Sequence, residues 1–175
     1  MKIAKLLSST LFLLLATFVS AQDLKLGKVS IAELEQKTHP KDSAATAAIL
    51  YKRGNARIEF NETDGFILAT DVETRIKIYK KDGYEYANQQ VAYYLDGNSR
   101  EMVTFSDAYT YNLLNGKVEK VKVKSDGFFD EEVNKYRGRK KIAFPNVKEG
   151  SVFKEIKLKG LLVNALFKVV VKTDR

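Results

Sequence analysis

The stretch that decides the fold is Phe66 to Ile78, which reads FILATDVETRIKI. Apolar and β-branched side chains occupy its even positions, and charged side chains occupy its odd positions from Asp71 to Lys77. Successive side chains of a strand point to opposite faces of a sheet, so this alternation predicts a long, half-buried antiparallel strand. We expect one face to pack on a core and the charged face to meet solvent.

Turn signals and further alternating runs continue this pattern on both sides. The pair Asn115-Gly116 lies between two such runs, and Asn-Gly in that position is the strongest short signal for a β-hairpin. We also expect a turn at Gly54-Asn55, between two short strands. With the hairpin arms included, the other predicted strands cover Ala47–Tyr51, Arg57–Asn61, Met102–Tyr111, Val118–Val123, Lys140–Phe144 and Val152–Leu158.

The first 21 residues have the pattern of a secretory signal peptide. Lys2 and Lys5 precede the apolar run 11–19, and small residues before Gln22 suit cleavage near Ala21. The run is short for a membrane span, and no Cys follows it as a lipoprotein anchor would need. We therefore expect an exported protein, periplasmic or extracellular, with no transmembrane segment and with residues 22–175 forming a single β-rich domain.

Three other segments complete the expected fold. Ser30 and Glu33 have the spacing of a capping box, which predicts a short helix over about residues 30–37. Residues 84–94 fit either a strand or a brief helix, and residues 128–132 fit a loop or a helical turn. The sequence thus predicts a mostly β fold: an antiparallel β-sandwich-like domain with a short N-terminal helix after the signal peptide.

Composition argues against several kinds of catalysis. The chain has no Cys, which removes disulfides, thiol nucleophiles and thiolate metal ligands. His39 is the one histidine, and we interpret it as an exposed turn residue; no Gly-x-Ser-x-Gly motif offers it a nucleophile. We therefore predict a protein that is not an enzyme, with no catalytic residue, no cofactor and no metal site.

One basic segment, residues 135–141, is the candidate binding site. Its candidate anion-binding side chains are Arg137, Arg139, Lys140 and Lys141, which suit phosphates or carboxylates. The net charge of the chain is +8, with acids interspersed. Two interpretations stay open: lysines on neighbouring strands extend a binding patch, or they block edge-to-edge aggregation of sheets. These lysines are Lys117, Lys120, Lys122 and Lys124.

The densest acidic cluster follows residue 125. It lacks the spacing of a Ca²⁺-binding EF-hand and is interrupted by two phenylalanines, so we interpret it as a solvated acidic loop. Its members are Asp126, Asp130, Glu131 and Glu132.

Several motifs occur together in a familiar order. They are Gly27–Ser30, His39–Ala44, Thr74–Ile78, Ala108–Leu113 with Asn115–Lys117, and Phe144–Ser151. Over about residues 25–153 the chain resembles the domain of unknown function found directly after the signal peptide, and N-terminal to a transglutaminase-like domain, in large exported bacterial proteins. Residues 154–175 depart from that family. We expect a truncated copy with a divergent tail; the alternative is that the tail forms one or two closing strands.

The resemblance implies a non-catalytic exported accessory or interaction domain. Its partner would be a transglutaminase-like domain or another envelope protein, and no specific nucleic acid is expected. The alternative function is a stand-alone binder of anionic envelope glycan or lipopolysaccharide through the basic segment. A third class, a hydrolase, has no residue set to support it. The sequence leaves the ligand and the oligomeric state open.

Overall fold

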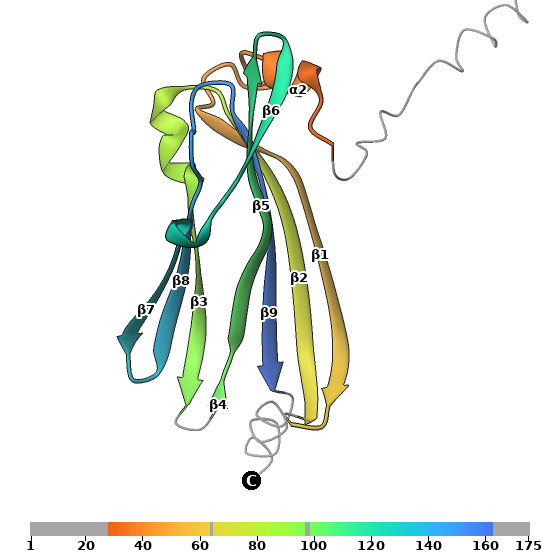
Figure 1. Cartoon of the computed structure of the whole chain (residues 1–175), viewed down its shortest axis with the longest axis vertical. Coiled ribbons are helices and arrows are strands. Elements are labelled where there is room, and N and C mark those ends of the chain that lie inside the picture. The colour runs from red at the N-terminus through yellow and green to blue at the C-terminus, as the bar shows by residue number, and fades with distance from the viewer. Residues whose placement is uncertain (1–27, 64, 97–98, 163–175) are drawn as a thin grey trace, which may run out of the picture.

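The computed structural model describes residues 28–63, 65–96 and 99–162. Within these ranges the protein is mostly β, with two antiparallel sheets and one short α-helix, as predicted (Figure 1). No helix in these ranges has the length and apolar character needed to cross a bilayer. The predicted signal peptide and residues 163–175 of the predicted tail lie outside the described residues.

The larger sheet has five strands in the order β1-β2-β9-β5-β6, all antiparallel to their neighbours. The last of the described strands, β9, thus lies at the centre of this sheet. It extends four residues beyond its predicted end at Leu158. The strands are β1 (Ala47–Asn61), β2 (Gly65–Ile78), β5 (Met102–Leu114), β6 (Lys117–Lys122) and β9 (Val152–Leu162).

The smaller sheet has four strands in the order β4-β3-β8-β7. Its strands are β3 (Asn88–Asp96), β4 (Ser99–Arg100), β7 (Phe128–Asn134) and β8 (Arg137–Ala143). Two short 3₁₀ helices, η1 (Lys81–Ala87) and η2 (Ser125–Gly127), precede β3 and β7. Glu101 links the sheets at one end: its backbone N–H donates to Tyr94 O at 3.0 Å, and its carboxylate accepts from Tyr94 N at 2.8 Å.

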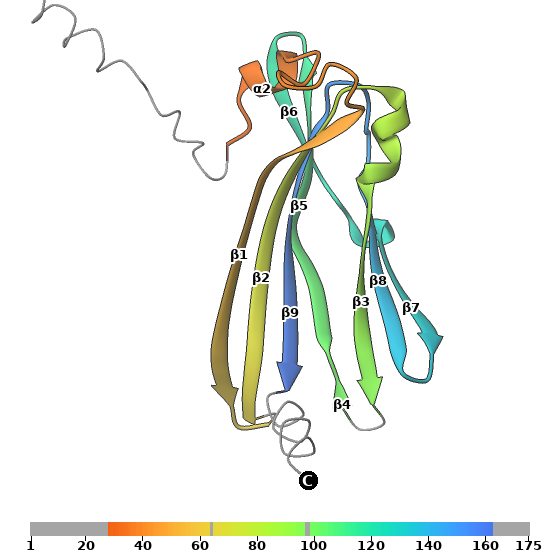
Figure 2. The ribbon, with the colours of Figure 1, turned by 180° about the vertical axis from the view of Figure 1, so that it is seen from behind.

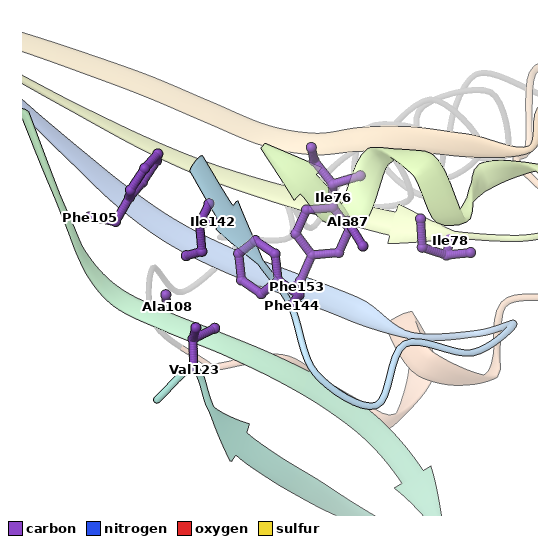
Figure 3. Close-up of a cluster of buried hydrophobic side chains, with 9 residues drawn as sticks. All are labelled: Ile76, Ile78, Ala87, Phe105, Ala108, Val123, Ile142, Phe144 and Phe153. Atoms are coloured by element: carbon purple, nitrogen blue, oxygen red, sulfur yellow. The ribbon is translucent and has the colours of Figure 1, made fainter. Parts of the chain in front are cut away.

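The main core lies between the two sheets, where Figure 3 shows side chains from both converging. Phe144 and Phe153 pack with ring centroids 4.5 Å apart, at the junction of the β8 end and the β9 start. Burying a side chain of this size contributes about 1.5–3 kcal/mol. The buried residues of this core are Ile76, Ile78, Ala87, Phe105, Ala108, Val123, Ile142, Phe144 and Phe153.

Strand β2 confirms the predicted apolar core face only toward its C-terminal end, because Phe66 on that face is 54% exposed whereas Ile67 and Ala69 on the other face are buried. Ile76 and Ile78 point into the core, as expected. The charged face, however, does not meet solvent at its upper end, because Arg75 is 3% exposed and Lys77 is 0% exposed. The cause is helix α2 (Ile31–Glu35), which packs over this face. A second apolar cluster joins helix and sheet there: Val29, Leu34, Tyr111 and Val152.

Polar contacts hold α2 on the sheet. Lys77 Nζ donates to Leu34 O at 3.2 Å and to Gly150 O at 2.9 Å, and Arg75 Nη1 pairs with Glu33 Oε1 at 2.8 Å. Glu33 also closes the predicted capping box with Ser30. Helices this short are not stable alone, so these contacts and the apolar cluster must stabilise α2. The helix covers residues 31–35 rather than 30–37.

The turn predicted at Asn115-Gly116 has the backbone geometry that its sequence indicates. Asn115 and Gly116 have φ of 50° and 72°, the two positive values that a type I′ hairpin turn needs, and the β5–β6 hairpin is confirmed. The ambiguous segment 84–94 divides between η1 and β3.

Two local predictions were wrong. Gly54-Asn55 is not a turn: β1 runs straight through it, with Gly54 opposite Val72 and Asn55 opposite Asp71. Residues 128–132 are neither a loop nor a helical turn, because they form strand β7 against β8. In both cases pairing with a neighbouring strand outweighs the local preference of the residues.

Gly138 allows one tyrosine to span three strands. Tyr93 on β3 is directly opposite Gly138 on β8, and a Cβ at Gly138 would lie 2.1 Å from Tyr93 Cζ. The Tyr93 hydroxyl donates to Asp130 Oδ1 on β7 at 2.6 Å. Since the ring is buried and held at its hydroxyl, it has little freedom to move aside.

Gly138→Ala should therefore destabilise the protein by about 1–3 kcal/mol, the usual cost of forcing an extra group into a packed site. Urea unfolding followed by tyrosine fluorescence measures this loss. Gly54→Ala is the matched control, since the nearest atom to a Cβ there is Asp71 O at 4.0 Å. An equal loss in both variants would contradict the role given to Tyr93.

The buried amine of Lys77 should make stability depend on pH. Burial, helped by the nearby charge of Lys37, lowers the pKa of Lys77 from 10.5 to about 8. Between these values the unfolded chain keeps a proton that the folded chain has released, so folding becomes more favourable as pH rises. Relative to Lys77→Met, the wild-type protein should gain up to about 3 kcal/mol between pH 8 and 10.5.

Urea unfolding of both proteins at several pH values tests this prediction. Groups common to both chains cancel in the difference. The control is Lys117→Met, which removes an exposed lysine and is measured at the same pH values. A stability difference between wild type and Lys77→Met that does not change with pH would refute the buried charge.

Candidate functional site

The four candidate cations all lie on strand β8, but they do not share one face. Arg137, Arg139 and Lys141 alternate with Lys140 along the strand. Lys140 points to the core side, where its Nζ is 3.6 Å from Asp130 Oδ2. The other three point away from the core. The structure thus brings together three of the four predicted residues.

These three cations belong to an exposed sheet surface, which we call the arginine face. In the register, Tyr94 is opposite Arg137, and Phe129 is opposite Lys141. Tyr94 is 54% exposed and Phe129 is 52% exposed. The outward side chains of β3, β7 and β8 that form the arginine face are Gln90, Ala92, Tyr94, Phe129, Glu131, Arg137, Arg139 and Lys141.

Charges on the arginine face are only partly compensated. Lys141 Nζ pairs with Glu131 Oε2 at 2.5 Å, and this contact lowers the pKa of Glu131. Within the described residues, Arg137 and Arg139 form no ion pair. Arg139 is opposite Glu131, and its charge also lowers the pKa of that carboxylate. The face therefore combines two guanidinium groups with two exposed aromatic rings, a composition that suits binding of carboxylates or phosphates.

The lysines of β6 do not extend this face. They lie in the larger sheet, and Figure 1 shows β6 at the opposite end of the molecule from the β7–β8 turn. Lys120 lies over the ring of Tyr109, with Nζ 3.7 Å from the centroid, which is a cation–π contact. Lys122 and Lys124 line a separate hollow of about 410 Å³ with Val123 and Phe144.

The acidic cluster is divided in the same way as the basic one. Asp130 points inward to Tyr93 and Lys140, whereas Glu131 points outward to Lys141. Asp126 lies apart in η2. In the part of the chain that the structure describes, no three His, Asp or Glu side chains are grouped to hold a metal ion. The four acids are exposed, as expected, but Asp130, Glu131 and Glu132 belong to the paired strand β7 and not to a loop.

His39 lies in a turn, as expected, with a bridge to Asp42. Its exposure was predicted wrongly, since it is half-buried and its ring packs edge-on to Tyr79 at 6.2 Å. Its Nδ1 is buried without a hydrogen-bond partner within the described residues. This environment supports a structural position rather than a base beside a nucleophile.

Sequence reasoning missed a buried carboxylate, Glu155. It is 1% exposed and points toward the core side from β9, between Phe153 and Lys157. Lys157 Nζ approaches Oε1 to 3.1 Å, but neither carboxylate oxygen accepts a well-aligned hydrogen bond. Burial accordingly raises the pKa of Glu155. The signal that could have found it is its position two residues after Phe153, which places both side chains on the same face of the strand.

Beside this carboxylate lies a cavity of about 320 Å³ between β1, β2 and η1. Thr74 contributes a buried hydroxyl that has no hydrogen-bond partner in the described residues. The cavity walls are Ala47, Ala48, Ile49, Lys52, Thr74, Ile76, Tyr86, Gln89 and Lys157. Its two lysines could neutralise a small anion, and no histidine, carboxylate or serine is among the residues that line it.

Comparisons with known proteins assign no family. No family model matches the chain, and no curated protein matches it. The chain is similar to the crystal structure of a candidate protease from Parabacteroides distasonis ATCC 8503, with a TM-score of 0.45 and 9% sequence identity. That match covers 56% of this chain and 20% of the other, so the chain spans a small part of that protein's length.

Glu155→Gln should stabilise the protein at pH 7. Because the folded pKa lies above the ordinary 4.5, stability falls as pH rises through this window, and removing the charge removes the penalty. The advantage should disappear at pH values below 4.5. Glu131→Gln is the control, since its pKa shifts the other way and its side chain is exposed. Thermal melts of the variants and the wild-type protein at pH 4 and pH 7 test this prediction. A lower melting temperature of Glu155→Gln than of wild type at pH 7 would contradict it.

Proposed function

We propose that this chain is a non-catalytic exported domain that acts by contact with another envelope molecule, through the arginine face. The observation that carries the proposal is the composition of that face. Arg, Tyr and Phe are among the residues enriched in protein interfaces, and Arg and Tyr are also enriched where binding energy is concentrated. Here Arg137 and Arg139 lie beside Tyr94 on a sheet face that the described residues leave exposed.

A non-catalytic role is supported by how the buried polar groups are used. Ser151 Oγ donates to Asn112 Oδ1 at 2.6 Å and accepts from Lys148 N at 2.8 Å, and the residue is fully buried. Lys77 is likewise buried and bonded to two carbonyls. Both side chains are buried and hydrogen-bonded within the fold, where a substrate could not reach them.

The resemblance suggests which partner the face contacts. By analogy with the family, we propose a transglutaminase-like domain or another envelope protein, met after export directed by the signal-peptide pattern of residues 1–21. The excess of guanidinium groups on the arginine face favours an acidic patch on that partner, because complementary charge steers association and excludes wrong partners.

The alternative is binding of anionic envelope glycan or lipopolysaccharide at the same face. One observation favours it: the flat ring of Tyr94 is directly opposite Arg137, so a stacking surface and a charged hydrogen-bond donor are adjacent. Rings of this kind can pack against sugars, while guanidinium groups pair with carboxylates and phosphates.

The double variant Arg137→Ala with Arg139→Ala distinguishes the two. Binding to a glycan predicts that wild-type protein is retained on immobilised heparin and lipopolysaccharide, that salt weakens retention, and that the variant loses it. The matched control removes two charges elsewhere, Lys117→Ala with Lys122→Ala on β6, and should be retained as wild type. Equal loss in both variants would show that net charge alone is responsible.

A protein partner is tested by photo-crosslinking in the cell that makes the chain. A benzoylphenylalanine in place of Tyr94 should give one discrete protein adduct, and the double arginine variant should remove it. The control position is Tyr86, which is 45% exposed and lies in η1, outside the arginine face. Turnover of peptides or glycosides by the wild-type protein would overturn the non-catalytic assignment.

A further inference from the structure

Strand β1 is a long and exposed edge of the larger sheet. It runs for 15 residues, and among the described strands its one neighbour is β2. In both views β1 is the outermost strand of its sheet (Figures 1 and 2). All residues from Lys52 to Phe60 are exposed. The outward backbone groups of such an edge are ready to pair with another strand.

One face of this edge is apolar near the β1–β2 turn. Ile58 is 59% exposed, Phe60 is 64% exposed, and Phe66 on β2 is 54% exposed. Phe60 is opposite Phe66, with ring centroids 5.1 Å apart. A cluster of apolar side chains left open on a strand edge gains free energy when a further strand covers its side.

The other face carries charges of alternating sign. Arg57 Nε pairs with Glu59 Oε1 at 2.6 Å, and Arg57 Nη1 also pairs with Asp71 on β2. Arg57 and Glu59 flank Ile58 at equal distances along the strand. The edge is therefore complementary in charge to a reversed copy of itself.

We propose that two copies of the chain pair antiparallel through β1, with the two-fold axis at Ile58. Ile58 then lies opposite the partner's Ile58, and Arg57 lies opposite the partner's Glu59. On the apolar face, Ala56 lies opposite the partner's Phe60. This pairing joins the two larger sheets into one continuous sheet with a closed, isologous interface.

Neighbouring registers are disfavoured by the same residues. A two-fold axis at Arg57 places this arginine opposite the partner's Arg57, and an axis at Glu59 places two glutamates opposite each other. Like charges directly opposite destabilise strand pairs. An axis at Ala56 leaves Ile58 opposite the partner's Gly54 and so loses its apolar contact. Charge and packing together select the axis at Ile58.

Disulfide trapping tests this register directly, because the natural chain contains no cysteine. The variant Ile58→Cys places two thiols at directly opposite positions, where Cα atoms lie about 4.5–5.5 Å apart and a disulfide is allowed. The matched control is Ala56→Cys, also exposed and on the same face, whose copies lie four residues out of register. Mild oxidation of the full exported chain should give covalent dimers of the first variant and leave the second monomeric.

Sedimentation equilibrium of the wild-type chain provides the second readout. It should show a dimer that Ile58→Lys weakens at least tenfold in Kd, with an unchanged melting temperature of the monomer because the residue is exposed. A wild-type monomer at every concentration would overturn the proposal. So would equal crosslinking of the Ile58→Cys and Ala56→Cys variants.

Discussion

The buried amine of Lys77 is the contact on which the upper half of the molecule depends. It joins strand β2 to the carbonyl of Leu34 in α2 and to the carbonyl of Gly150 before β9. Beside it, Ile78 N donates to Ser151 O at 2.8 Å, and Gly150 N donates to Ile78 O at 3.0 Å. A buried cation is costly unless it is hydrogen-bonded, so the three segments must remain together. This is how a helix of five residues stays on the sheet and how β9 enters its centre in register.

The polar groups around Lys77 are hydrogen-bonded within the fold. The two exposed surfaces proposed as contact sites lie elsewhere, on strands. The arginine face occupies the outward side of the smaller sheet, and the β1 edge borders the larger one. These two surfaces belong to different sheets, so contact at one leaves the other free. The core around Phe144 and Phe153 gives both surfaces a rigid framework, as the proposed role in surface contact requires.

Patterns local in sequence predicted much of the fold, whereas contacts between distant segments explain the failures. The alternation of β2 and the positive φ values at Asn115-Gly116 are properties of a few consecutive residues. What covers the charged face of β2 is decided by α2, more than thirty residues away, and alternation carries no information on it. The four candidate cations lie on two faces because β8 begins at Arg137, three residues before its predicted start. Successive residues of a strand point to opposite faces, so Lys140 is separated from the other three.

The most direct test of this account is a titration of the lysine side-chain amines by nuclear magnetic resonance, with ¹³Cε and ¹⁵Nζ shifts followed between pH 6 and 12. We predict that one lysine, absent from the spectrum of Lys77→Met, titrates near pH 8. If Lys77 titrated near its ordinary pKa of 10.5, its amine would be solvated, and the contact that holds α2, β2 and β9 together would not exist.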